Sequence, residues 1–261
     1  MALVQVEDRG AVRHLILNRP EKRNALNGEL IAALGQAVEE AAQAEQVRCV
    51  VLRGAGAMFS AGMDFSDLAR LAGDPARLRP LRARILAVWN LLEEMAKPTI
   101  AQIHGGCLGG AFELALACDL RTVASDAVLG LLETRVGLVP DLGGCSRLPA
   151  VVGVGRAKEL IMTARLINGE EAERIGLANR VAPAERLEEA TEGLVRELLA
   201  CSPVAVGLAK RVIDQAARPT LATALEQELA VQELCARSEE FAAGVRALAE
   251  RRQPDFSPPG S

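Results

Sequence analysis

The sequence has no tyrosine, and aromatic residues occupy only 2% of its 261 positions. So few rings disfavour a protein that binds single-stranded nucleic acid by stacking bases on aromatic side chains. The formal net charge of −4 also disfavours an electrostatic grip on nucleic acid phosphates or on an anionic membrane. We therefore expect neither a nucleic acid partner nor a membrane partner.

Several motifs that define other classes of protein are missing too. The two histidines are far apart and no HExxH or Cys/His cluster occurs, so we expect no metal site. The absence of GxSxG disfavours a serine hydrolase, and the absence of GxGxxG and GxxxxGK[ST] disfavours dinucleotide and triphosphate binding. No stretch approaches the roughly 20 apolar residues that span a bilayer, and the first residues do not resemble a signal peptide. We therefore expect a cytoplasmic protein.

What the sequence does contain fits one globular core. Half of its residues are apolar and a quarter are charged, which is typical of a soluble protein with a sizeable interior. The six cysteines include no CxxC pair, and in a cytosolic protein we expect them to be small buried apolar residues.

The order of apolar patterns and turn residues predicts an α/β fold. Along the chain we predict two short strands within residues 3–17, a helix capped by Asn27, a strand at 49–52, a helical stretch ending near 95, a strand at 99–103, and a glycine turn at 104–110 that opens a helix. Alternating strands and helices imply crossover connections and a parallel or stacked sheet. We place an α/β core at residues 1–195 and a helical region at 196–261, where Ala, Leu, Glu and Arg dominate.

Two glycine-containing turns are candidates for binding a negatively charged oxygen. Gly109 and Gly110 stand between a predicted strand and a helix, where free backbone N–H groups and the helix dipole point at the same place. The turn at 60–64 follows another strand and can supply a further N–H. An enolate formed from a thioester needs such donors where charge builds up on its oxygen. Glycine turns between strands and helices are common, so each turn alone is a weak signal.

Three acidic residues stand in apolar surroundings. Glu113 lies in the first turn of an otherwise apolar helix, Glu133 follows the run AVLGLL, and Asp141 ends the turn GLVPD. A carboxylate removed from water needs a partner or has a raised pKa, which suits proton transfer near neutral pH. The alternative for each is a purely structural carboxylate, such as one that complements a helix dipole.

With these motifs in place, the sequence resembles the crotonase superfamily of enoyl-CoA hydratases and isomerases over nearly its whole length. The similar stretches are LNRPEKRNALN (17–27), MFSAGMDF (58–65), IHGGCLGGAFELALACD (103–119), LLETRVGLVPDLGGCSRL (131–148), ARLINGEEAERIGLANRV (164–181) and FAAGVRALAERRQPDF (241–256). The resemblance implies a spiral of ββα turns, with a helical C-terminal region that forms a homotrimer or a hexamer of two trimers.

The resemblance also implies roles for individual residues. The N–H groups of Met63 and Gly110 would form the oxyanion hole, and Glu113 and Glu133 would hold and activate a water. Coenzyme A would be part of the substrate, with no separate cofactor. The residues implied in substrate and CoA binding are Lys22, Arg23, Ala25, Ala61, Asp64, Phe65 and Gly109.

One position departs from the hydratase pattern, because typical hydratases carry glycine where this sequence has Asp141. An aspartate there resembles the proton-shuttling residue of some enoyl- and dienoyl-CoA isomerases. Our leading hypothesis is an enoyl-CoA hydratase in which Glu133 protonates the α-carbon and Glu113 deprotonates water. The alternatives are an isomerase that uses Asp141 and Glu133, and a non-catalytic acyl-CoA-binding scaffold.

Arginines are frequent between residues 66 and 90, the segment expected to shape the acyl end of the pocket. They are Arg70, Arg77, Arg79, Arg82 and Arg84. They could bind a carboxylated acyl group, but we expect them to lie on solvated helix faces because charged residues are mostly exposed.

Overall fold

The computed structural model of the protein describes residues 2–217, 221–252 and 254. Three residues of the C-terminal motif at 241–256, namely 253, 255 and 256, lie outside this part. None of the helices described is long and apolar enough to cross a membrane.

The helices and strands have the following bounds. The strands are β1 (Val4–Arg9), β2 (Val12–Leu17), β3 (Cys49–Gly54), β4 (Thr99–Ile103), β5 (Gly106–Leu108), β6 (Leu120–Ala124), β7 (Val128–Gly130) and β8 (Arg180–Ala182). The α-helices are α1 (Gly28–Gln43), α2 (Phe65–Gly73), α3 (Leu78–Glu94), α4 (Gly110–Ala117), α5 (Gly144–Val152), α6 (Val154–Thr163), α7 (Gly169–Arg174), α8 (Leu187–Leu199), α9 (Pro203–Ala217), α10 (Leu221–Ala236) and α11 (Glu239–Ala249). Short 3-10 helices are η1 (Pro20–Lys22), η2 (Pro75–Arg77), η3 (Glu133–Val136) and η4 (Ala184–Arg186).

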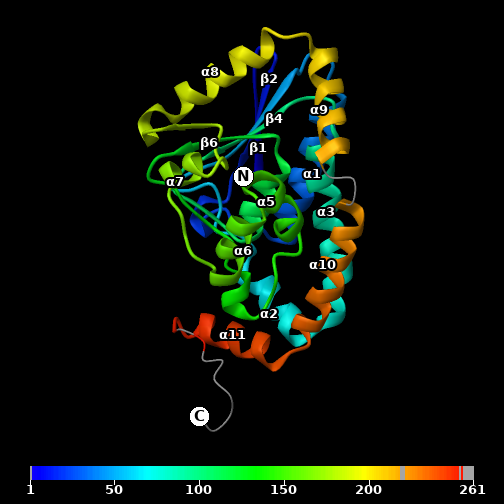
Figure 1. The fold of residues 1–261 in the computed structure, drawn as a ribbon, viewed down its shortest axis with the longest axis vertical. Helices are drawn as coiled ribbons and strands as arrows, with labels where there is room; N and C mark the ends of the chain where they lie inside the picture. Colours follow the sequence, from blue (N-terminus) through cyan, green and yellow to red (C-terminus); the bar gives the residue numbers. More distant parts are fainter. Residues whose placement is uncertain (1, 218–220, 253, 255–261) are drawn as a thin grey trace.

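A sheet in the order β1-β2-β3-β4-β6-β8 lies in the upper half of the view in Figure 1, between α8 and α9. β1 pairs with β2 in the antiparallel sense, and the other neighbours in this sheet are parallel. β3 is buried along almost its whole length, as its run of β-branched valines requires in a parallel sheet with both faces covered. The predicted α/β class and stacked sheet are confirmed.

A second, two-stranded sheet gives the fold its spiral form. After β4 the chain makes β5 and then α4, and after β6 it makes β7 and then η3; β5 and β7 pair in parallel. The predicted glycine turn at 104–110 is therefore partly wrong, because β5 lies inside it. Two successive ββα-type turns thus bring the start of α4 and the start of η3 side by side.

The helices cover the sheets from several directions. α8 packs on β3, β4, β6 and β8, and the expected boundary after residue 195 falls inside this helix. α10 packs on α3 and α5, while α11 contacts α2 and η3 (Figure 1). α4 is buried along its whole length, with apolar residues on every side except for Glu113. The helical C-terminal region therefore reaches back to the elements around α4.

Candidate active site

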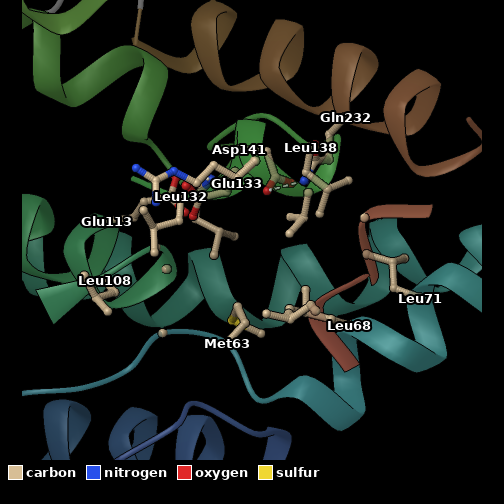
Figure 2. Close-up of a pocket in the computed structure, with 18 of the residues that line it drawn as sticks. Met63, Leu68, Leu71, Leu108, Glu113, Leu132, Glu133, Leu138, Asp141 and Gln232 are labelled. Carbon is tan, nitrogen blue, oxygen red and sulfur yellow. Dashed lines mark hydrogen bonds between the residues drawn. The ribbon is translucent and has the colours of Figure 1, made fainter. Parts of the chain in front are cut away.

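A cavity of about 380 Å³ opens between α2, α3, the N-terminal end of α4, the segment after η3, and the helices α10 and α11. Figure 2 shows the acidic residues Glu113, Glu133 and Asp141 on one side of it, together with Leu132 and Leu138, and only apolar labelled residues, Met63, Leu68, Leu71 and Leu108, on the other. The apolar wall comes mainly from Leu68, Leu71, Leu78, Leu81, Ile85, Leu138 and Leu142. Such a wall suits a hydrocarbon chain, because its burial removes apolar surface from water.

Two backbone N–H groups, those of Met63 and Gly110, converge on this cavity. Leu26 donates its N–H to the Gly62 carbonyl at 2.8 Å, and its carbonyl accepts from the Asp64 N–H at 2.9 Å. The N–H of Met63, which lies between Gly62 and Asp64, therefore points away from Leu26. Within the described chain, neither the Met63 N–H nor the Gly110 N–H donates a hydrogen bond. Both amides are therefore available to a ligand oxygen.

The two turns that carry these amides are locked against each other by glycine. Gly62 has a φ of +92°, and a Cβ atom on it would lie 2.5 Å from the carbonyl oxygen of Leu108 and 3.6 Å from the Gly110 nitrogen. Gly109 has a φ of +52° and donates its N–H to Gly130 at 2.8 Å, which leaves the next N–H free at the start of α4. The predicted oxyanion hole at Met63 and Gly110 is thus geometrically possible.

The turn that follows Asp141 holds the side chain of Glu113. Its side chain is buried, and its Oε1 accepts hydrogen bonds from the N–H groups of Leu142 at 2.8 Å and Gly144 at 2.9 Å. Burial raises the pKa of Glu113 well above its usual value, and the charges of Glu133 and Asp141 raise it further. The bound Oε1 fixes the orientation of a carboxylate that faces the cavity.

Glu133 begins η3 and lies beside the free amides. A Cβ atom on Gly109 would be 3.0 Å from Oε1 of Glu133, so a side chain there would crowd this carboxylate. Its Oε2 is buried and has no hydrogen-bond partner among the described residues. Burial raises the pKa of Glu133 to about 7, and the charge of Asp141 contributes in the same direction. Glu133 can therefore donate or accept a proton at neutral pH.

Asp141 lies on the same side of the cavity, close to Glu133 (Figure 2). Its Oδ1 accepts a hydrogen bond from Nε2 of Gln232 at 3.1 Å, and its Oδ2 is 3.3 Å from Nε of Arg82. Burial raises the pKa of Asp141 to about 7, although the cation of Arg82 opposes this. The structure therefore brings all three predicted acids, Glu113, Glu133 and Asp141, to one pocket.

The residues predicted to bind substrate and CoA divide into two groups. Ala61 and Gly109 line the cavity, whereas Lys22, Arg23, Ala25, Asp64 and Phe65 lie outside its lining, on the segment from the end of η1 to α1 and on the loop that leads into α2. The loops are joined because the Ala61 N–H donates to the Arg23 carbonyl at 2.9 Å. The Asp64 carboxylate caps α2 through Ser66 and pairs with Arg19 at 2.6 Å, which gives it a structural task in this structure.

Sequence reasoning missed Gln232, and it considered Arg82 only as a possible contact of a carboxylated acyl group or as a solvated residue. The prediction that all five arginines between 66 and 90 are solvated is wrong for Arg82, which is only 5% exposed. A signal was present, because Arg82 falls on the same face of α3 as Leu78 and Ile85, both of them buried. Gln232 similarly shares a buried face of α10 with Leu229 and Ala236.

A spiral of ββα turns, with two free amides facing buried carboxylates, defines a protein of the crotonase superfamily. The family model described as enoyl-CoA hydratase/isomerase matches residues 7–259, and the chain belongs to this family. It is therefore a hydratase/isomerase-type enzyme.

Individual relatives agree with this assignment. The chain is 36% identical to methylglutaconyl-CoA hydratase of Mus musculus over 97% of its own length and 85% of that protein. It is 34% identical to crotonyl-CoA hydratase of Syntrophomonas wolfei, covering 97% of the chain and 96% of the relative. Its structure is similar to that of an enoyl-CoA hydratase from Mycobacterium avium subsp. paratuberculosis, with a TM-score of 0.88, 28% identity and coverage of 98% and 99%.

Proposed function

We propose that the enzyme adds water to a 2-enoyl-CoA thioester. The thioester oxygen accepts hydrogen bonds from the N–H groups of Met63 and Gly110, which stabilise the enolate as charge develops. Glu113 orients and deprotonates a water whose oxygen forms the bond to the β-carbon, and Glu133 delivers a proton to the α-carbon. The observation that carries the proposal is the convergence of two free amides with these two carboxylates on one apolar cavity.

The acyl group is proposed from the cavity wall and from the relatives. The leucine-lined side favours a short aliphatic enoyl group, which agrees with a relative named for crotonyl-CoA. A second relative is named for methylglutaconyl-CoA. For the CoA part we propose the two joined loops, with Lys22 and Arg23, both exposed, as phosphate contacts.

Isotopic labelling tests the reaction directly. In water enriched in oxygen-18, the purified protein should convert crotonyl-CoA to a 3-hydroxyacyl-CoA that carries one heavy oxygen. Mass spectrometry of the product measures this incorporation. A panel of straight, branched, dicarboxylic and doubly unsaturated acyl-CoAs, each with its product identified, defines the acyl specificity. Absence of any labelled hydroxyacyl product across the panel contradicts hydration.

Isomerisation is the second candidate, and the position of Asp141 beside Glu133 favours it. In that reaction one acid removes a proton from the acyl chain and another returns it to a different carbon. The product then contains no solvent oxygen, and Asp141→Asn abolishes turnover. The same labelled assay with 3-enoyl- and dienoyl-CoA substrates therefore separates the two reactions.

We also propose that the protein assembles as a homotrimer or as a hexamer of two trimers. α9 exposes an apolar stripe of Val204, Leu208, Val212 and Ile213, each at least 57% exposed. An apolar stripe of this kind is costly to leave in water and suits burial in a subunit interface. Light scattering after size-exclusion chromatography should give three or six times the chain mass of 27.6 kDa. A monomeric mass at micromolar concentration contradicts the proposal.

A further inference from the structure

Two side chains from different helices hold Asp141 in place. Arg82, on α3, donates from Nε to the Asp141 main-chain carbonyl at 2.9 Å, and the same Nε is 3.3 Å from the carboxylate Oδ2. Gln232, on α10, donates from Nε2 to Oδ1, while its own Oε1 accepts the Val139 N–H at 2.9 Å. Arg82 and Gln232 are only 5% and 3% exposed, so these contacts are shielded from water. Oδ1 of Asp141 thus has an amide donor, whereas Oδ2 is buried without a hydrogen bond among the described residues and is held only by the ion pair with Arg82.

The neighbouring acid, Glu133, has a different environment. Its Oε2 is buried without a hydrogen-bond partner among the described residues, and no ion pair of Glu133 occurs in that part of the chain. Its Oε1 lies against Gly109, a residue without a side chain. The two acids of the pocket therefore differ in their partners, although burial affects both.

Partners decide which of two coupled acids carries a shared proton. Two carboxylates in one water-poor site repel each other when both are ionised, so near neutrality they hold about one proton between them. A cation and an amide donor stabilise the charged form of an acid, whereas a buried oxygen without a donor favours the protonated form. Each acid has one buried oxygen without a hydrogen bond among the described residues, and backbone N–H groups of Glu133 and Leu132 lower the pKa of Glu133 in part. Of the two acids in the described chain, however, only Asp141 has a cation and a side-chain amide beside its carboxylate.

We propose that Arg82 and Gln232 hold Asp141 as the charged member of this pair, so that the shared proton resides on Glu133 and the third acid acts as a positioning residue instead of a proton shuttle. The inference rests on the proposed hydration, in which Glu133 gives a proton to the α-carbon. A fixed negative charge at Asp141 keeps that proton on Glu133 until the enolate forms. An acid held by a buried cation and an amide is poorly suited to a relay, which requires it to take up and release protons.

Other charged or titratable groups around the pair do not reverse this preference. Glu228, on α10, accepts the Gly143 N–H at 3.1 Å and lies 3.9 Å from Nη2 of Arg82. Its charge raises the pKa of Asp141, but the cation of Arg82 lowers that pKa more strongly. Glu113, on α4, has Oε1 occupied by two backbone N–H groups. The Cys145 thiol, on α5, stays neutral because burial raises its pKa to about 12. Arg135 and Arg252 line the same cavity but are exposed.

Infrared spectroscopy of the full-length protein reports where the proton lies. At about pH 7, where the pair holds about one proton, Glu133→Gln should remove a C=O stretching band of a protonated carboxyl group and leave the bands of other protonated acids in place. Asp141→Asn should leave that band in place. Loss of the band in Asp141→Asn together with its survival in Glu133→Gln overturns the proposal. This measurement needs no substrate, so it remains decisive even if hydration is not the reaction.

The pH dependence of crotonyl-CoA hydration tests the roles of the two helical residues. Arg82→Met and Gln232→Leu should transfer the proton toward Asp141 and move the alkaline limb of kcat to lower pH, by about one unit for Arg82→Met. Arg82→Lys, which keeps the cation, should restore most of the limb. A rate that falls equally at every pH, with an unmoved limb in both variants, shows a merely structural role and overturns the proposal. Gln232→Leu keeps the test valid if Arg82→Met does not fold.

Failure of this proposal is distinguishable from failure of the proposed function. If the parent protein incorporates no solvent oxygen, hydration is wrong while the infrared bands still locate the proton. If hydration occurs but the bands assign the proton to Asp141, the function stands and the positioning role of Arg82 and Gln232 is wrong.

Discussion

Two regions of this molecule bury titratable side chains beside a cavity, and only one of them has the features of an active site. Besides the acidic pocket, a smaller cavity of about 190 Å³ lies between α8 and the sheet, next to His14 of β2. His14 is only 4% exposed, and its Nδ1 has no hydrogen-bond partner among the described residues. Burial lowers the pKa of His14 to about 4, so its neutral form prevails. The cause is the same as for the buried acids, because burial favours the uncharged form of either kind of group.

The difference lies in what surrounds the buried group. Around His14 the cavity wall consists of β-strand and mid-helix residues, with Arg9 and Glu188 already paired at 2.5 Å at its edge. The acidic pocket instead has two unpaired backbone N–H groups, those of Met63 and Gly110, beside its carboxylates. A shifted pKa alone is thus a poor indicator of catalysis, and convergence with preorganised donors is the better one.

The largest effect expected from this comparison is on the two glutamates of the acidic pocket. Glu113→Gln and Glu133→Gln should each lower kcat for crotonyl-CoA hydration by about 10²–10⁴-fold, because each removes a group that moves a proton. The same change in the other region, Glu188→Gln, serves as the matched control and should alter kcat by less than about twofold. Near-normal turnover in both pocket variants contradicts the assignment of the site.

A second prediction concerns the unpaired backbone N–H groups of the acidic pocket, here that of Gly110, which distinguish it from the His14 cavity. Gly110→Pro removes the N–H but suits the first position of α4, so the helix should persist while kcat falls by about 10²–10³-fold. Gly110→Ala keeps the N–H and adds a Cβ atom 3.2 Å from Cγ of Met63, which isolates the effect of crowding. Equal losses in the two variants attribute the effect to crowding and count against the N–H.

The two regions should also respond to pH in opposite directions. The pKa of Glu133 is raised to about 7 in the folded protein, so its contribution to stability is fully present below the unfolded value of 4.5 and is lost as pH rises through about 7. In Glu133→Gln the free energy of unfolding should therefore fall less between these values than in the parent. Urea unfolding at a series of pH values measures the slope, and identical slopes exclude the raised pKa.

The smallest effect on catalysis is expected at His14. Its pKa is lowered to about 4, so its contribution is present above the unfolded value of 6.5 and is lost as pH falls through about 4. In His14→Phe the acid-side loss of stability should shrink, while kcat for hydration stays within about twofold. Thermal unfolding between these pH values measures the first effect. A large loss of turnover in this variant refutes the contrast between the two regions.

Much of the fold follows from local patterns, and the parts that do not are those that depend on distant pairing. Asn27 begins α1 as predicted, because a side chain that accepts the Leu30 N–H is a local feature. β5, β6 and β7 were not predicted. β5 and β7 have three residues each, and their partners lie more than twenty positions away.

The candidate site shows the same division. Glu113, Glu133 and Asp141 were found because a charged residue within an apolar run is visible in the sequence. The contacts of Arg82 and Gln232 with Asp141 were missed because they join residues far apart in the sequence. Arg82, on α3, lies 59 positions from Asp141, and Gln232, on α10, lies 91 positions from it. Nothing local distinguishes such a residue from a solvated one except the apolar face that it shares.

Gly62 has a consequence for how this enzyme can diversify. Any side chain at Gly62 would clash with the Leu108 carbonyl, so no other residue is tolerated where the turns that carry the Met63 and Gly110 amides meet. The leucine wall contributed by α2 and α3 carries no such restriction, since volume-conserving apolar exchanges are usually tolerated. Natural variation and laboratory selection for new acyl groups should therefore accumulate along residues 68–85 and leave the turn at 60–64 unchanged.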